Sequence, residues 1–150
     1  MGSRCLLALA AALAFGAPAA HAYNNTTDGP ISGYSGRPGD SSCTSSCHTA
    51  TGGYTGSISF SGATTVQASS LNNAFSLIFT TNAPRGGFNL SAYYVSGASN
   101  VGGLGTSDGN VQAVGTDELA HNAPTAPSAG AVTWTFNWDA PATAGSYRFY

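Results

Sequence analysis

Hydrophobic and polar residues alternate in several short runs between residue 54 and residue 150, and turn-forming residues separate these runs. A period of two places alternate side chains on opposite faces of a β-strand. The clearest run is 132–138, in which Val, Trp, Phe and Trp alternate with Thr, Thr and Asn. Further strands are expected over 54–60, 74–81, 88–95, 111–114 and 146–150. The first of these is expected to be half-buried.

No window of the chain shows a helical period of apolar residues. Several short strands at fairly regular spacing predict an all-β, antiparallel sandwich or barrel. Because Trp134, Phe136 and Trp138 share one strand face, we expect them in the core rather than on a sugar-stacking surface. The glycine-rich stretch 101–115 offers only 111–114 as a strand.

The first 22 residues have the pattern of a signal peptide. Arg4 precedes the apolar run 5–15, and Ala20-His21-Ala22 is a small-x-small cleavage site. We therefore expect an exported protein: periplasmic, outer-membrane-associated or extracellular. Residues 23–53 form a turn-rich lead-in that carries a Cys/His motif, and 54–150 form one β domain. The chain stops inside an expected strand, which predicts a truncated C-terminus and a missing segment that could anchor the protein.

Charge limits the partners of the mature chain. Three arginines and six carboxylates remain after cleavage, a formal net charge of 3 − 6 = −3. A protein with a net negative charge is a poor partner for nucleic acid or anionic membranes. No stretch after residue 22 is long and apolar enough to cross a bilayer. We expect neither nucleic-acid binding nor a transmembrane segment.

The motif in the lead-in is Cys43-Thr44-Ser45-Ser46-Cys47-His48. Covalent attachment of haem c uses two thiols, which add to the two vinyl groups, and a histidine directly after the second cysteine, which coordinates the iron. His48 has that position. The spacer has one residue more than the usual Cys-x-x-Cys-His, and a loop residue can bulge outward while both sulfurs reach the vinyl groups. The motif predicts one covalent haem c, with His48 as the proximal iron ligand.

Two alternatives remain open for the same residues. A Cys43–Cys47 disulfide suits an exported protein, although so small a loop stabilises the fold by only about 2 kcal/mol, and it assigns no role to His48. Cys43, Cys47, His48 and His121 could also form a Cys2His2 zinc site.

His121 is the remaining donor for the second axial position of a haem iron. The chain has no lysine, its single methionine is Met1, and His21 leaves with the signal peptide. The sequence therefore predicts His121 as the distal ligand, although a histidine in a loop-like stretch such as 120–124 is ordinarily just exposed. Two imidazole ligands favour ferric iron and leave no open site for a substrate, which favours electron transfer over catalysis.

Other polar clusters have simpler explanations. Asp117-Glu118 and Asp108-Gly109-Asn110 could supply oxygens to calcium, but their spacing is unspecific, and we expect solvated turns. No Ser/His/Asp set can be argued from the sequence, so we expect a protein that is not an enzyme.

Several segments together resemble bacterial reeler-like domains, which are described as choice-of-anchor domains. The resemblance covers residues 33–150, and its most specific parts are the Cys/His motif after Pro38-Gly39-Asp40, the loop around His121 and the strand 134–141. It implies an immunoglobulin-like antiparallel β-sandwich, often tethered through a C-terminal sorting segment. It also implies a haem site of the Cys-x-x-Cys-His type, which corresponds here to Cys43, Cys47 and His48.

These observations lead to two functional hypotheses. The first is an exported monohaem c-type cytochrome domain for electron transfer, with an unidentified redox partner protein. The alternative is a non-catalytic extracellular adhesion or matrix module with a Cys43–Cys47 disulfide.

Overall fold

The computed structural model describes residues 32–41, 53–95, 99–115 and 117–150. Within these ranges the chain forms strands and no helix, which confirms the prediction of an all-β protein for this part of the chain. The strands are β1 (Gly56–Gly62), β2 (Asn73–Thr81), β3 (Asn89–Tyr94), β4 (Ser99–Asn100), β5 (Gly103–Thr106), β6 (Val111–Val114), β7 (Glu118–His121), β8 (Ala131–Asp139) and β9 (Tyr147–Phe149).

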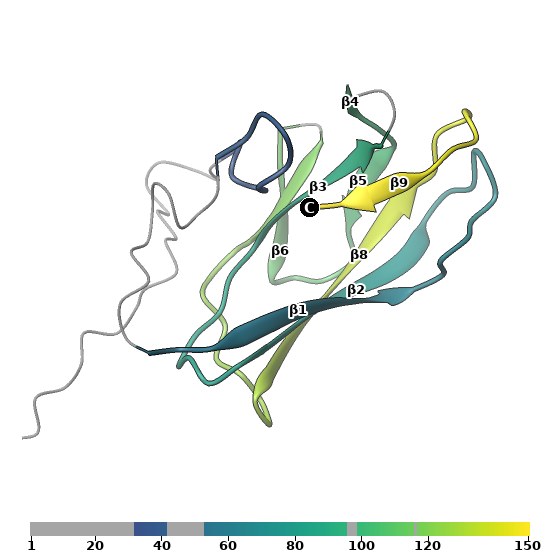
Figure 1. Ribbon diagram of the computed structural model, residues 1–150. Helices are drawn as coiled ribbons and strands as arrows, with labels where there is room; N and C mark the ends of the chain where they lie inside the picture. Colours follow the sequence, from purple (N-terminus) through teal and green to yellow (C-terminus); the bar gives the residue numbers. More distant parts are fainter. Residues whose placement is uncertain (1–31, 42–52, 96–98, 116) are drawn as a thin grey trace, which may run out of the picture.

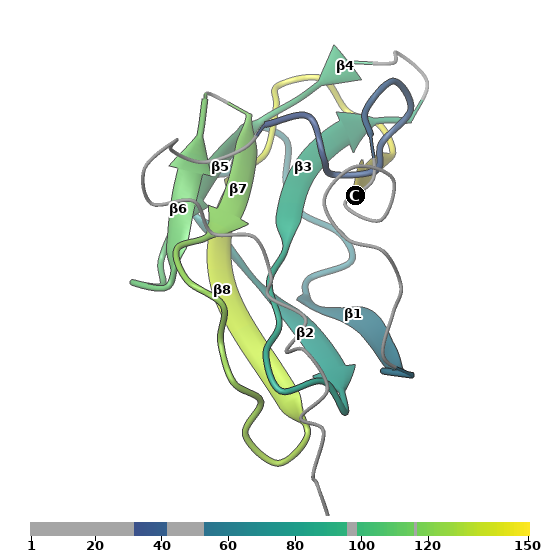
Figure 2. The ribbon, with the colours of Figure 1, turned by 90° about the vertical axis from the view of Figure 1, so that its left-hand side faces the viewer.

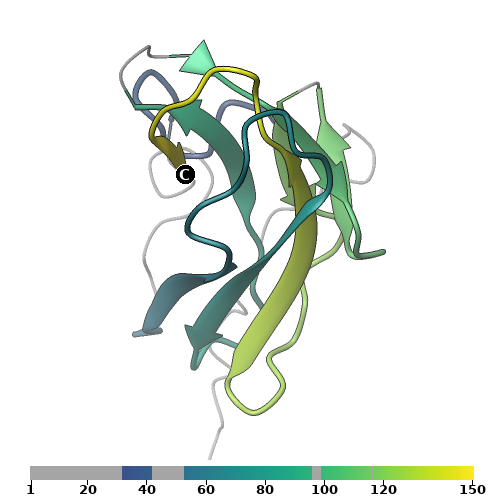
Figure 3. The same cartoon turned by 90° about the vertical axis from the view of Figure 1, so that its right-hand side faces the viewer.

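The strands form two antiparallel sheets that face each other (Figure 1). One sheet has the order β1-β2-β8-β5, and the other has the order β4-β3-β7-β6, with β9 also paired to β3. The centre of the first sheet is the long antiparallel pair of β2 and β8, which run side by side in Figure 3. The predicted antiparallel arrangement is therefore confirmed.

The hydrophobic core lies between the sheets, and the alternating face of β8 supplies its largest side chains. Trp134 and Phe136 are 1% and 0% exposed, and Trp138 is buried as well, so their predicted place in the core is confirmed. Leu90 of β3 and Leu119 of β7 approach from the second sheet and are equally buried. At about 25 cal/mol per Å² of apolar surface removed from water, these side chains dominate the stability of the fold.

The predicted burial of the first strand is wrong. β1 has the expected alternation, but all seven of its residues are exposed, Ile58 by 63% and Phe60 by 42%. Its register pairs Ile58 with Phe79 and Phe60 with Leu77, so both side chains lie on the sheet's inner face. The three residues of β9 cover that face only in part, where Phe149 contacts the Phe60 ring at 5.6 Å between centroids.

The glycine-rich region contains a strand that the sequence pattern did not predict. β5 pairs with the last part of β8, with Leu104 opposite Trp138. Gly102, just before β5, has φ +74°, and a Cβ there would meet the Trp138 indole and the Asp139 carbonyl oxygen. Because glycine has no side chain, a glycine-rich strand shows no alternation of apolar and polar residues in the sequence. The glycines are instead explained by the close approach of this segment to β8.

Candidate functional site

The residues predicted to bind haem are only partly within the described ranges. Cys43, Cys47 and His48 lie outside the described residues. His121 lies within them and is the last residue of β7. The expectation of a loop around His121 is therefore wrong for that residue, because the strand begins at Glu118 and the turn begins only after His121.

The His121 side chain continues the ladder between β3 and β7 at the point where the two strands separate. The backbone N–H of His121 donates to the carbonyl oxygen of Phe88 at 3.3 Å. The Nδ1 atom of the imidazole lies 2.9 Å from the Phe88 backbone nitrogen and 2.9 Å from the Phe88 carbonyl oxygen. The ring thus takes the place of the His121 carbonyl oxygen as the partner of the Phe88 N–H, while the other backbone hydrogen bond of this residue pair is formed.

These two distances allow two neutral tautomers. In one, Nδ1 accepts a hydrogen bond from the Phe88 N–H, and the proton is on Nε2. In the other, Nδ1–H donates to the Phe88 carbonyl, and Nε2 carries the lone pair. The second arrangement is the one that metal-binding histidines use, because a backbone carbonyl on Nδ1 orients the ring and directs Nε2 at the metal.

Gly87 covers the ring. A Cβ at this position would overlap Cε1, Nε2 and Nδ1 of His121, so only glycine allows this close approach. The Nε2 atom is buried. In the described conformation the chemistry of the ring fits an iron ligand, but Nε2 is not presented to a group as large as haem.

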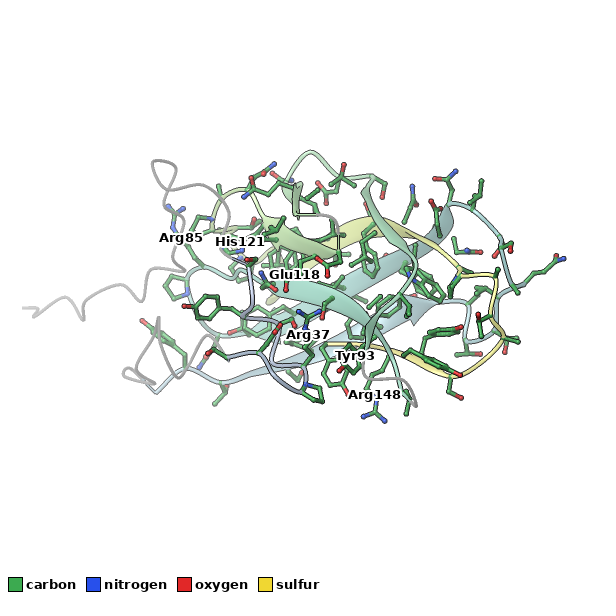
Figure 4. The ribbon with its side chains drawn as sticks, turned by 90° about the horizontal axis from the view of Figure 1, so that it is seen from above. Arg37, Arg85, Tyr93, Glu118, His121 and Arg148 are labelled. Carbon is green, nitrogen blue, oxygen red and sulfur yellow. The ribbon has the colours of Figure 1, made fainter. Side chains whose placement is uncertain are left out.

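One end of the two sheets, which we call the His121 end, is where the chain that follows the motif enters the fold. β1 starts there: the Thr55 N–H donates to Asn82 Oδ1 at 2.7 Å, directly after β2 ends. The segment after β2 contains Arg85 and Gly87, and Gly87 lies against the His121 ring; Figure 4 shows Arg85 and His121 toward the same end of the sheets. The chain that leaves the motif therefore enters the β fold at the end where His121 lies.

The residues just before the motif are also fixed to the fold. Residues 32–41, which we call the latch loop, lie on the outer side of β3 and β7 (Figure 2). The Gly33 N–H donates to both carboxylate oxygens of Glu118, at 3.1 and 2.9 Å. The Ser91 hydroxyl of β3 donates to the Ser35 hydroxyl oxygen at 2.9 Å.

Glu118 lies in a different environment from the one that its sequence context predicts. A solvated turn was expected at Asp117-Glu118, but Glu118 belongs to β7 and is only 3% exposed. Its carboxylate lies 3.7 Å from the guanidinium of Arg37. Arg37 also pairs with Asp40 at 2.9 Å, and Asp117 lies at its periphery, 3.9 Å away. A single buried carboxylate thus holds a loop that is far from it in sequence.

The turn expected at Asp108-Gly109-Asn110 is confirmed, since the Asn110 N–H donates to Asp108 Oδ1 at 2.8 Å.

A cleft lies at the opposite end of the sheets. It has a volume of about 780 Å³, and aromatic residues of both sheets line it, among them Phe60, Phe75, Trp138, Tyr147 and Phe149. Because the cleft lies where β1 ends and β9 begins, it is separate from the His121 end.

Within the described residues, no group of three or more His, Cys, Asp and Glu side chains is arranged to hold a metal ion. The same part of the chain contains no helix with the length and hydropathy needed to cross a membrane. Both predicted cysteines and His48 are outside these ranges, so the haem and zinc hypotheses depend on residues beyond them.

The chain matches no protein-family model, no curated protein and no solved structure. The fold and the geometry around His121 and Glu118 are therefore the basis for any statement about function.

Proposed function

We propose that this protein is an exported monohaem c-type cytochrome domain for electron transfer, built on an immunoglobulin-like, reeler-like β-sandwich. Cys43 and Cys47 bind the haem covalently, His48 is the proximal iron ligand, and His121 is the distal one. The observation that carries the proposal is the sequence Cys-x-x-x-Cys-His in a chain whose mature part has one other imidazole, no methionine and no lysine. When bound, haem c supplies a one-electron couple between ferric and ferrous iron.

The geometry around the motif supports this proposal. The latch loop ends at Ser41, whose N–H donates to the Gly33 carbonyl oxygen at 3.0 Å, and the β domain resumes at Thr55 beside Asn82. The segment before the motif is thus attached to the sheet that contains His121, through Glu118, and the segment after it begins the other sheet beside Asn82.

His121 can act as a ligand through the tautomer in which Nδ1–H donates to the Phe88 carbonyl. This hydrogen bond holds the ring in place and leaves the Nε2 lone pair for iron. Because Nε2 is buried beneath Gly87, ligation requires the turn at Gly86-Gly87 to move away from the ring. This movement breaks the bridge between Gly86 and Thr125, whose backbone N–H groups donate to each other's carbonyl oxygens at 2.8 and 2.9 Å.

The burial of Nε2 also favours the second candidate function. If His121 serves only to terminate the β3–β7 ladder, its position is explained without iron, and Cys43 and Cys47 are free to form a disulfide. The protein would then be an exported, non-catalytic extracellular adhesion or matrix module with a Cys43–Cys47 disulfide.

Absorption spectroscopy of the ferric protein separates these functions. We would produce the protein with a cytochrome c maturation system, stain a denaturing gel for haem, and record the spectrum of the coloured product. The Cys43→Ser/Cys47→Ser double variant is the matched control and should lose the stain. In a coloured protein, His121→Ala should convert a low-spin ferric spectrum to a high-spin one, because the sixth ligand is lost. An unchanged spectrum rejects His121 as the ligand, and a colourless product with both thiols oxidised to each other rejects the haem.

A further inference from the structure

β1 is the longest of the described strands that lie at the edge of a sheet. It forms one margin of the sheet β1-β2-β8-β5, and within the described part of the chain it pairs only with β2, without a bulge (Figure 3). Its sequence, GSISFSG, contains no charge and no proline, and all seven residues are exposed. Monomeric proteins ordinarily protect such an edge with lysine, proline, a bulge or a very short strand. The outer edge of β1, which we call the free edge, is therefore suited to pairing with another strand.

The backbone groups that face the free edge can be assigned from the register. The Asn82 N–H donates to the Thr55 carbonyl oxygen at 3.3 Å, in the same register as the pairing of β1 with β2. Because hydrogen-bonded pairs alternate along an antiparallel ladder, the three serines of β1 bond to β2. The N–H and C=O groups directed at the free edge belong to the other four residues: Gly56, Ile58, Phe60 and Gly62.

The sequence of β1 is nearly symmetric about Ser59. Glycine stands three residues away on both sides, serine two residues away, and Ile58 and Phe60 are its immediate neighbours. A second copy of β1, antiparallel and related by a two-fold axis at Ser59, therefore places glycine opposite glycine and Ile58 opposite Phe60 of the second copy. Both residues direct their backbone groups at the free edge, so each such pair exchanges two hydrogen bonds. A shift of two residues would place either Ile58 or Phe60 opposite a glycine, so the symmetric register is favoured.

This pairing also covers apolar surface that a single copy leaves in water. Ile58 is 63% exposed and Phe60 is 42% exposed, and both side chains lie on the inner face of the sheet. At both ends of β1, phenylalanine rings of β2 already lie where a Cβ of the glycines would be. The uncovered apolar surface is therefore the middle of the strand. Cross-strand apolar pairs of this kind are a main source of stability in antiparallel sheets.

Charge and area determine how strongly two copies associate. Residues 54–84 contain no charged side chain, so two β1 edges approach each other without like-charge repulsion. A strand of this length extends over about 23 Å and a sheet layer is about 10 Å thick, which gives about 500 Å² of buried surface for both copies together. Stable dimers bury ~1,200–2,000 Å², so we expect a transient dimer with a dissociation constant of ~0.1–1 mM.

We propose that β1 is a docking edge for a second copy of this chain: two β1 strands pair antiparallel about Ser59 and join two four-stranded sheets into one. A second copy is the occupant because the symmetry of the strand matches the two-fold axis of a closed dimer. The pairing does not involve the haem motif, and it is compatible with either of the functions described above.

The first test is sedimentation equilibrium of the mature protein. Its average mass should rise from that of a monomer at ~0.02 mM toward that of a dimer at ~1 mM. Ser59→Lys adds a charge on the exposed outer face and places two lysines opposite each other at the axis, so it should weaken association by about fivefold. An equimolar mixture of Ser59→Lys and Ser59→Glu should associate about tenfold more strongly than either variant alone.

Thr133→Lys is the matched control. Ile78 pairs with Ser59 on one side and with Thr133 on the other, so Thr133 is exposed on the same face, two strands further from the free edge. It receives the same charge and should associate like the wild type.

Hydrogen exchange measured by NMR is the second test. The amides of Ile58 and Phe60 should exchange about two- to fivefold more slowly at ~1 mM than at ~0.05 mM, because exchange requires the free edge of a monomer. The amides of Ser57 and Ser59 are bonded to β2 and should not depend on concentration.

A protein that stays monomeric at ~1 mM overturns the inference. A dimer that Ser59→Lys and Thr133→Lys affect equally also overturns it, because the contact would then lie elsewhere on the molecule. A third contrary result is a monomer in which the amides of Ile58 and Phe60 are protected at every concentration, since another segment of the same chain would then cover the edge.

Discussion

The contact between Gly87 and His121 leads to a prediction that can be worked out from the structure. Replacing Gly87 with alanine adds one methyl group where the imidazole ring already lies. The backbone of Gly87 is not in the left-handed region, so the alanine itself is not strained. The ring must move, and the hydrogen bond between Phe88 and Nδ1 at 2.9 Å is lost or lengthened.

The expected loss of stability in Gly87→Ala has two parts. Inserting a methyl group into a filled site costs ~1–3 kcal/mol, and a lost hydrogen bond costs ~0.5–1.5 kcal/mol. We expect Gly87→Ala to lower the free energy of unfolding by about 2–3 kcal/mol. With a urea dependence of ~2 kcal/mol per M, the unfolding midpoint should fall by about 1 M.

Urea unfolding followed by tryptophan fluorescence measures this effect, since Trp134 and Trp138 are buried. Gly109→Ala is the control, because a Cβ at Gly109 meets nothing within 4 Å. It should leave the free energy of unfolding within about 0.5 kcal/mol of the wild type. If Gly87→Ala and Gly109→Ala have the same midpoint, the described packing of His121 against Gly87 is refuted.

Two further predictions concern the sheets. Trp134→Ala should reduce the free energy of unfolding by about 3–5 kcal/mol, because it leaves a cavity at the centre of the core. Ile58→Ser on the exposed β1 should change the free energy of unfolding by less than about 1 kcal/mol. Equal effects of the two variants in urea unfolding would contradict the difference in burial. Gly102→Ala should destabilise the protein by more than about 1 kcal/mol, since φ is +74° and the new Cβ would meet Trp138. Gly105→Ala, whose Cβ would find only ordinary contacts with Asn137, should cost clearly less, and the reverse order in thermal unfolding would refute this account of β5.

Alternation predicts a strand where one face is buried and the other is not. β8 is such a strand, with Trp134 and Phe136 inward and Thr133 and Thr135 outward, and its position, core face and large side chains followed from the sequence. β1 has the same alternation, but its burial depends on whether the opposite sheet extends over it. Whether the opposite sheet covers β1 depends on the whole fold, so the local sequence pattern does not predict it.

β7 was not predicted because both of its faces are buried. Leu119 faces the core, and Glu118 faces the latch loop, so the strand has no alternation between apolar and polar residues. The partner of Glu118 is 85 residues away at Gly33. A charged residue next to another acid normally indicates a solvated turn, and only the long-range contact shows that Glu118 is buried.

The sequence singled out His121 as a candidate ligand by elimination among the possible donor side chains. It could not show that Nδ1 would lie beside Phe88 or that Gly87 would cover Nε2, because both depend on the pairing of β3 with β7. The two glycines at 86 and 87 were the available signal, since adjacent glycines often mark a close backbone approach.

The central claim is that Cys43 and Cys47 bind haem covalently. It is tested most directly by mass spectrometry of the intact mature protein, made in cells with a cytochrome c maturation system, followed by sequencing of the peptide that contains both cysteines. We predict a mass increase of one haem, located on the peptide with Cys43, Cys47 and His48. A protein that is lighter by two hydrogen atoms than the reduced chain, with Cys43 linked to Cys47, would contradict the account.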